Sequence, residues 1–174
     1  MAIANIPEWA RIQQQEIIYD PDLVVQYKFN GMDGLYKLGD KSYESLIVQP
    51  ISYRTRYSQR FGSGFQTWFD FCFVDEQSKV AMMPLKKESA NIVMDWISGL
   101  LLDGIAPHAV KVVLQSKRIP VQVVDEQTKN TYDDFYYAVL PDEYEFVDEE
   151  RFKIVSELKA RNIRFAPLGE VWNG

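Results

Sequence analysis

Residues 66–74 read Gln-Thr-Trp-Phe-Asp-Phe-Cys-Phe-Val, and this stretch decides the fold. Three alternate positions are phenylalanines: Phe69, Phe71 and Phe73. The intervening positions are Trp68, Asp70 and Cys72. Because successive side chains of a strand point to opposite faces, the pattern predicts a strand whose phenylalanine face packs in the core. A polar turn at Asp75–Ser78 then leads into residues 79–85, so the two segments predict a β-hairpin.

A second long strand is predicted before this hairpin, over residues 43–60. Pro50 cannot donate a ladder hydrogen bond, which favours a sheet edge or a bulge at that point. From Ile51 onward, aromatic and β-branched residues alternate with serines and arginines. One face of the strand therefore carries three arginines, Arg54, Arg56 and Arg60. A glycine-rich loop with aromatic flanks follows at residues 61–65.

After the hairpin the pattern changes to a helical period. Apolar residues at i, i+3 and i+4 spacing predict a helix over residues 88–103. They are Ile92, Val93, Trp96, Ile97, Leu100 and Leu101. Ser89 is the expected N-cap of this helix, and Gly104 is its expected stop.

Two more strands and a final helix complete the predicted core. The strands cover residues 110–124 and 135–140, with a turn at residues 125–130 between them. The turn repeats an earlier one, because Val-Asp-Glu-Gln-Ser-Lys at residues 74–79 recurs as Val-Asp-Glu-Gln-Thr-Lys at residues 124–129. Asp148 is the expected cap of the last helix.

This order of elements resembles the OB-fold, a five-stranded Greek-key barrel that often binds single-stranded nucleic acid or oligosaccharide. The expected fold class is therefore mainly β with α: an OB-fold-like five-stranded barrel with a helix between strands three and four and a C-terminal helix. We expect an N-terminal extension at residues 1–42 and the barrel domain at residues 43–147. Residues 148–174 are expected to form a helix and tail packed on the same domain. Another small barrel and an open antiparallel sheet with helices on one face remain alternatives.

The resemblance implies a ligand face on the second and third strands of the barrel. In this chain, that face comprises Trp68, Asp70 and Cys72, with Lys79, Ala81 and Met83 on the next strand. Single-strand binders combine a positive groove for the backbone with aromatic rings on which bases stack. We therefore expect a single-stranded DNA-binding protein with low sequence specificity. The expected phosphate contacts are Arg54, Arg56 and Arg60, and the expected stacking residues are Tyr57, Phe61 and Trp68, with Lys79 nearby.

Two other interpretations compete with this one. The arginines also suit a solvated face whose tyrosines pack in the core. The chain is also rich in large rings, with 10 Tyr, 10 Phe and 4 Trp, which suits an oligomeric interaction or adaptor module without a nucleic acid ligand. Homo-oligomerisation or a protein partner would cover such rings. A carboxylate enzyme is a third interpretation, resting on the acidic pairs at residues 133–134 and 148–150.

Charge and composition limit these possibilities. The chain of 174 residues has a net charge of −6, yet residues 51–118 hold nine basic and six acidic residues, a net charge of +3. Contact with nucleic acid is therefore expected along one strip only. A single cysteine and a single histidine exclude an internal disulfide and a cysteine-based zinc site. No catalytic motif occurs, so we expect a non-enzymatic, cytoplasmic protein without metal, cofactor or membrane contact.

Overall fold

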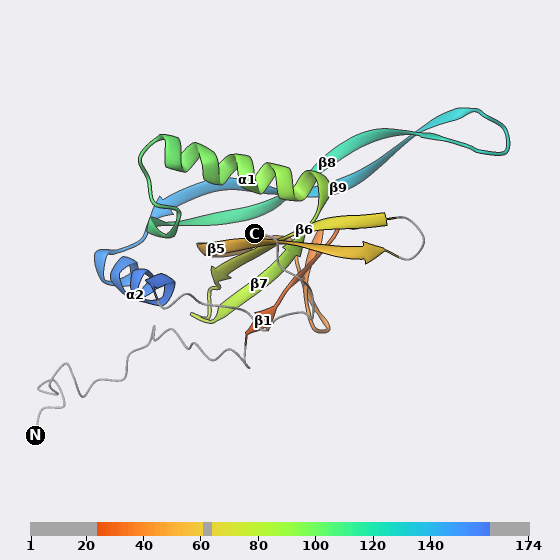
Figure 1. Ribbon diagram of the computed structural model, residues 1–174. Helices are drawn as coiled ribbons and strands as arrows, with labels where there is room; N and C mark the ends of the chain where they lie inside the picture. Colours follow the sequence, from red (N-terminus) through yellow and green to blue (C-terminus); the bar gives the residue numbers. More distant parts are fainter. Residues whose placement is uncertain (1–23, 61–63, 161–174) are drawn as a thin grey trace, which may run out of the picture.

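The computed structural model describes residues 24–60 and 64–160, and the side chains of residues 56–66 lie outside this description. Within these residues the protein is mainly β with two α-helices (Figure 1). Six strands form the main sheet in the order β1-β7-β6-β5-β8-β9. Their bounds are β1 Val25–Gln26, β5 Leu46–Arg60, β6 Gly64–Val74, β7 Val80–Leu85, β8 Val110–Val124 and β9 Thr131–Phe146.

The remaining elements surround this sheet. A smaller sheet consists of β2 Lys28–Asn30, β3 Leu35–Leu38 and β4 Lys41–Tyr43. The helices are α1 Lys87–Leu102 and α2 Glu149–Ala160, with a 3-10 turn, η4, at Pro107–Ala109. The three strands, helix, two strands and helix predicted from residue 43 onward are all present in that order, and β9 is longer than expected. Residues 1–23 of the expected N-terminal extension and the tail after residue 160 lie outside the described residues.

The described strands do not close into a barrel. β1 and β9 lie at the two edges of the main sheet, and no pairing joins them. β5 bridges the two halves of the sheet, because it pairs with β6 along most of its length but with β8 only from Leu46 to Val48. The register shifts between Pro50 and Ser52, where the proline predicted a bulge. The architecture is therefore an open, mainly antiparallel sheet.

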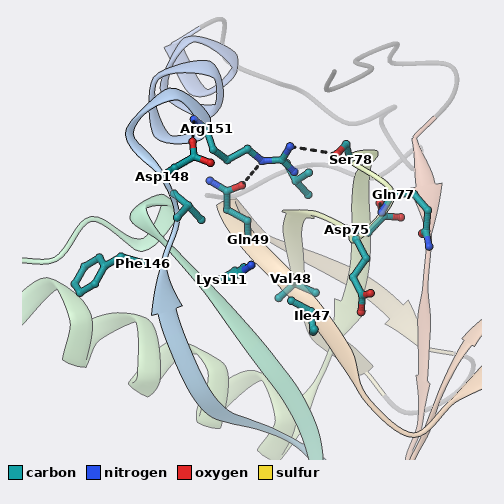
Figure 2. A pocket seen from close by; sticks show the side chains of 13 residues that line it. Ile47, Val48, Gln49, Asp75, Gln77, Ser78, Lys111, Phe146, Asp148 and Arg151 are labelled. Carbon is teal, nitrogen blue, oxygen red and sulfur yellow. Dashed lines mark hydrogen bonds between the residues drawn. The ribbon is translucent and has the colours of Figure 1, made fainter. Parts of the chain in front are cut away.

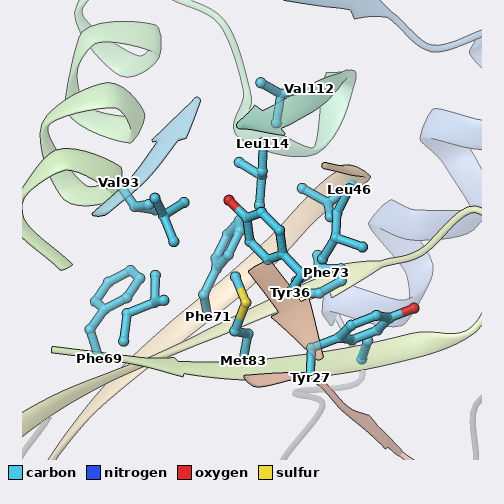
Figure 3. Close-up of a cluster of buried hydrophobic side chains, with 14 of the residues drawn as sticks. Tyr27, Tyr36, Leu46, Phe69, Phe71, Phe73, Met83, Val93, Val112 and Leu114 are labelled. Atoms are coloured by element: carbon cyan, nitrogen blue, oxygen red, sulfur yellow. The ribbon is translucent and has the colours of Figure 1, made fainter. Parts of the chain in front are cut away.

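The phenylalanine face of β6 forms the centre of the main core, as predicted. Phe69, Phe71 and Phe73 are buried and contact one another at ring distances of 5.4 and 6.2 Å along the strand. α1 contributes Val93 and Ile97, and further residues come from several other strands (Figure 3). They include Tyr27, Tyr36, Leu46, Met83, Val112, Leu114 and Val139. Burying each large apolar side chain stabilises the fold by about 1.5–3 kcal/mol.

A second buried cluster lies on the opposite face of the hairpin. Cys72 and Val74 of β6 and Met82 of β7 gather there with Val155 and Leu158 of α2. The two helices therefore cover opposite faces of the same strands. Asp148 caps α2 as predicted, because its Oδ1 accepts the N–H of Arg151 at 2.7 Å.

The sequence predicted the C-terminal end of α1 correctly but not its N-terminal end. Gly104 ends the helix as expected, with a φ of +76° and hydrogen bonds from Gly104 N to Leu101 O and from Ile105 N to Leu100 O. The prediction that Ser89 is the N-cap is wrong, because the helix starts at Lys87 and its N-cap residue is Lys86, three residues before Ser89. Ser89 is buried instead, and its hydroxyl accepts the backbone N–H of Val139 in β9 at 3.0 Å.

The repeated sequence forms related but unequal turns. In the first copy, Asp75 Oδ1 accepts the N–H groups of Gln77 and Lys79, and Ser78 has a positive φ. In the second copy, Asp125 Oδ1 accepts the N–H of Gln127, but the positive φ falls one residue later, at Lys129. The aspartate starts both turns in the same way, and the second loop is one residue longer.

Part of the segment expected as an N-terminal extension belongs to the core. β1 pairs in parallel with β7, and Tyr27 and Tyr36 are buried against the phenylalanines. The Tyr36 hydroxyl donates to the backbone oxygen of Gln115 in β8 at 2.7 Å. Residues 24–43 therefore fill one side of the core and tie the small sheet to β8.

The turn between β2 and β3 supports β9 through a close approach. Gly31 O accepts the N–H of Tyr137 at 2.8 Å. Gly34 has a φ of +73°, and a Cβ there would lie 2.9 Å from Cγ of the Tyr137 ring. Gly39 also has a positive φ, of +60°, but no atom lies within 4 Å of the position of its Cβ.

These two glycines give a matched test of the turn contact. Gly39→Ala is expected to lower the free energy of unfolding by about 1–2 kcal/mol, the cost of a left-handed alanine. Gly34→Ala carries the same cost and adds overpacking against Tyr137, about 1–3 kcal/mol more. Urea denaturation of both variants measures the difference. Equal losses would show that the contact between Gly34 and Tyr137 is unimportant.

Candidate nucleic-acid interface

A groove lies where β2, the ends of β6 and β7, the start of α1 and β9 meet. Its volume is about 470 Å³. Its aromatic lining residues are Phe29, Trp68, Tyr136 and Tyr137, and its lysines are Lys28, Lys86 and Lys87. Glu88 is the acidic residue among those that line it. We call this the lysine–aromatic groove, and it combines the two residue types that a single-strand binder needs.

Trp68 is the predicted site residue that the groove contains. It is half-buried in β6, and Lys86 Nζ lies 5.1 Å from the centre of its ring. Lys86 is also the residue before α1, which brings the lysines to the N-terminal end of that helix. The N-terminal end of a helix carries a partial positive charge, so the backbone adds to the positive potential of the groove.

Arg54, a predicted phosphate contact, has a structural partner instead. In the register of β5 and β6 it lies opposite Asp70, and its Nε is 3.4 Å from Asp70 Oδ2. Asp70 is 1% exposed, so this carboxylate needs polar partners inside the protein. The arginine compensates a buried charge, a role that strand alternation alone does not reveal.

The rest of the predicted ligand face is divided by the strand register. Phe71 lies opposite Met83 and Phe73 opposite Ala81, so Ala81 and Met83 face the core and the prediction that they share the face of Trp68 is wrong. Cys72 is buried beneath α2. Burial raises the pKa of its thiol to about 12, so the thiolate that a nucleophile requires is disfavoured.

Lys79 lies at the other end of the hairpin from Trp68. It follows the Asp75 turn, and its backbone N–H donates to the Asp75 carboxylate. Six residues of β6 separate Trp68 from Val74 beside that turn, about 20 Å at the rise of a strand. The structure therefore does not bring Lys79 and Trp68 together. The side chains of Arg56, Tyr57 and Arg60, and all of Phe61, lie outside the described residues.

A second cavity, of about 510 Å³, is polar and was missed by the sequence pattern (Figure 2). Arg151 of α2 is its centre, donating from Nε to Gln49 Oε1 at 3.0 Å and from Nη1 to Ser78 Oγ at 3.2 Å. Burial lowers the pKa of this guanidinium, and the carboxylates of Asp148 and Asp75 oppose that effect. These contacts join α2 to β5 and to the turn between β6 and β7, so the cluster is structural.

Two buried groups extend this polar cluster. Tyr27 donates its hydroxyl to Asp75 Oδ2 at 2.9 Å, and burial, with the neighbouring carboxylate, raises the pKa of the tyrosine. Gln49 donates from Nε2 to the backbone oxygen of His108 at 2.8 Å. Among residues 24–60 and 64–160, no group of three or more histidine, cysteine, aspartate or glutamate side chains could hold a metal ion.

His108 is held in one tautomer by α2. The Ser156 hydroxyl donates to Phe152 O at 2.7 Å, so it accepts from His108 Nε2 at 2.9 Å. His108 Nδ1 is buried and has no partner among the described residues. A proton there would lack an acceptor, and burial, together with the charge of Lys159, lowers the pKa of His108.

No helix in the described part of the chain is both long and apolar enough to span a bilayer.

Arg54→Ala is expected to lower the free energy of unfolding by about 1–3 kcal/mol, because the buried Asp70 loses a charged partner. The matched control is Arg118→Ala, since Arg118 is exposed and lies 3.8 Å from the Phe135 ring centre on the surface. That variant should change stability by about 1 kcal/mol or less. Urea denaturation compares the two, and a smaller loss for Arg54→Ala than for the control would refute the structural role.

His108 predicts a stability that falls with acidification. In the unfolded chain the imidazole binds a proton below about pH 6.5, whereas in the folded protein its pKa is lower. The unfolded state therefore binds more protons, and the free energy of unfolding falls as the pH falls through that range. Urea midpoints measured between about pH 7 and about pH 5 should decline less in His108→Gln than in the original protein. Parallel declines would mean that other groups cause the pH dependence.

No protein-family model, curated protein or solved structure matches this chain. The residues of the lysine–aromatic groove and of the polar cluster are therefore the basis for assigning a function. Of the two, the groove is accessible to a ligand through exposed and half-buried side chains, whereas the polar cluster is already connected by internal hydrogen bonds.

Proposed function

We propose that this protein binds single-stranded DNA, without catalysing a reaction and with little sequence specificity. The observation that carries the proposal is the pairing of Trp68 with Lys86 in a groove that also holds two further lysines and three further rings. The OB-fold likeness supports it through the order of the elements only. An open sheet in place of a barrel leaves the groove at the end of β6 and β7 rather than across a barrel face.

The energies favour a base over the lysine on the Trp68 ring. An exposed cation on an aromatic face contributes about 0.5–1 kcal/mol. A stacked base contributes about 1–3 kcal/mol. A base that displaces Lys86 from the ring therefore gains more than it costs, and the released ammonium can follow the adjacent phosphate. Lys86 then stabilises the complex through a second, charge-based contact.

The groove favours a single strand because its rings need base faces that a duplex keeps stacked. Its polar lining holds lysines rather than a set of paired donors and acceptors aimed at base edges. Such a lining recognises the backbone and the ring face, which all bases share. Low sequence specificity follows from that chemistry.

The arginine strip of β5 extends the proposed site. Arg56 lies directly opposite Trp68 in the register of β5 and β6, and Arg60 lies opposite Gly64. A nucleic-acid strand leaving the groove along this hairpin would meet Arg56 and then Arg60, which the alternation of the sequence predicts on one face, whereas it predicts Tyr57 on the other; Phe61 follows in the next loop. Their part in binding remains a prediction. Arg54 is left out of the proposed contacts because it compensates Asp70.

Trp68→Ala is expected to weaken binding of oligo-dT by about 1–3 kcal/mol through loss of one stacked base. Trp68→Phe keeps a ring and should retain most of the affinity. Fluorescence anisotropy of a labelled oligonucleotide measures both, with duplex of equal length as the comparison. Thermal unfolding of both variants separates lost contact from lost folding.

Lys86→Gln and Lys79→Gln form a matched pair that locates the site. Each phosphate contact on a single strand contributes about 0.7 to the slope of log affinity against log salt, so Lys86→Gln should reduce that slope by about this amount. Lys79→Gln removes an equal charge at the far end of the hairpin and should leave the slope unchanged. Equal effects would mean that only net charge matters, and no binding at low salt would refute the function.

A further inference from the structure

The hairpin of β8 and β9 projects from the body of the protein as a two-stranded arm (Figure 1). β5 pairs with β8 only at residues 112–114, so from Lys117 outward the strand partner of β8 is β9. We call residues 117–124 and 131–138 the arm. Its base is fixed where Ala138 is buried and Tyr137 meets the turn at Gly31.

The two faces of the arm differ. One face carries Ile119, Val121, Val123, Tyr132 and Tyr136, which the register places on alternate positions of the two strands. The same face also carries Lys117 near the base and Asp134 beside Tyr132, which is 52% exposed. The other face carries Arg118, Gln122 and Asp133 with Val124 and Phe135, and the Arg118 guanidinium covers the Phe135 ring. The first face, the apolar arm face, is the one suited to a partner.

A two-stranded ribbon is marginally stable alone and gains stability when a third layer covers an apolar face. Nucleic acid is a poor partner for this ribbon. Its outer part, from Val121 to Asp134, holds four acidic residues and one lysine, a net charge of −3, which repels phosphate, whereas Lys117 and Arg118 lie at its base. A protein surface that offers apolar side chains, together with a positive charge opposite Asp134, is a better partner for this ribbon.

We propose that the partner is the same face of a second copy of this chain, packed antiparallel about a two-fold axis. The axis passes by the Ile119–Tyr136 pair, and Tyr136 also lines the lysine–aromatic groove, so the proposed dimer lies at the edge of that groove. Lys117 lies one same-face step toward the base, and the Val121–Asp134 pair lies one step toward the tip. An antiparallel pairing therefore brings Lys117 of each copy beside Val121 and Asp134 of the other. The charges are self-complementary, and the symmetry uses each contact twice.

The area of the face sets the strength of the dimer. Eight residues of strand extend about 25 Å, and two strands with their side chains are about 10 Å wide. This gives a few hundred Å² for each partner, below the roughly 800 Å² of a stable complex. The dimer is therefore weak and dissociates on dilution. It forms without DNA, so its failure and the failure of DNA binding are separate outcomes.

Sedimentation velocity over a concentration series, from about 10 µM to about 1 mM, tests the dimer in the absence of DNA. The protein should shift from monomer toward dimer across the series. Ile119→Asp should abolish the shift, because it places a charge at the centre of the apolar arm face. The matched control is Gln122→Asp, which adds a charge to the opposite face and should leave the shift unchanged. Circular dichroism verifies that both variants fold.

A charge exchange identifies the partner as a second copy. Lys117→Asp and Asp134→Lys should each raise the dissociation constant about tenfold, because one reversal creates two repulsive contacts in a two-fold dimer. The double variant, with both changes, should restore dimerisation. A monomer at every concentration, a dimer that Ile119→Asp leaves intact, or a double variant as weak as the singles would each overturn the proposal. The proposal would also be overturned if the protein stayed monomeric at every concentration and Ile119→Asp weakened the binding of oligo-dT.

Discussion

The phenylalanine face of β6 is the constraint on which the rest of the structure depends. Three large rings on one side of one strand must leave water, and no single neighbouring element is wide enough to cover them. α1 covers part of the face, the β2–β3–β4 sheet covers another part through Tyr36, and β8 contributes Val112 and Leu114. The sheet stays open because helices and a second small sheet, rather than strand closure, bury these rings.

The opposite face of β6 is divided along its length, and that division positions the candidate site. α2 covers the end at Cys72 and Val74, and its placement is fixed by the Arg151 contacts to Gln49 and Ser78. The end at Trp68 lies beyond this cover and opens into the lysine–aromatic groove. The polar cluster therefore has an indirect role, because by holding α2 at one end it leaves the other end accessible.

Local patterns predicted the elements, whereas distant contacts decided the roles of their side chains. Alternation places Phe69 and Asp70 on opposite faces, but it cannot show that Asp70 is buried and that Arg54 is required beside it. The face on which Ala81 and Met83 lie depended on the register of β7 against β6, which pairs Met83 with Phe71 on the core face and which the sequence of the turn does not specify. The polar cluster joins residues 49, 78, 108 and 151, whose separation in sequence gave no signal. The length of β9 was underestimated at both ends. Residues 131–134 lie beyond the core, and residues 141–146 pair with the core end of β8 although they include a proline and three acidic residues.

The charge distribution distinguishes the two proposed surfaces, which share Tyr136. A net charge of −6 spread evenly would repel nucleic acid everywhere, but here lysines gather at the start of α1, while acidic residues gather at residues 142–150 and, in smaller number, toward the tip of the arm. Phosphate is therefore attracted to the lysine–aromatic groove and repelled by the acidic segments. Two copies joined through their arms would bring their two grooves close together, because Tyr136 lines the groove and lies beside the proposed two-fold axis. A strand long enough to reach both grooves would then bind with a raised effective concentration, although each contact alone is weak.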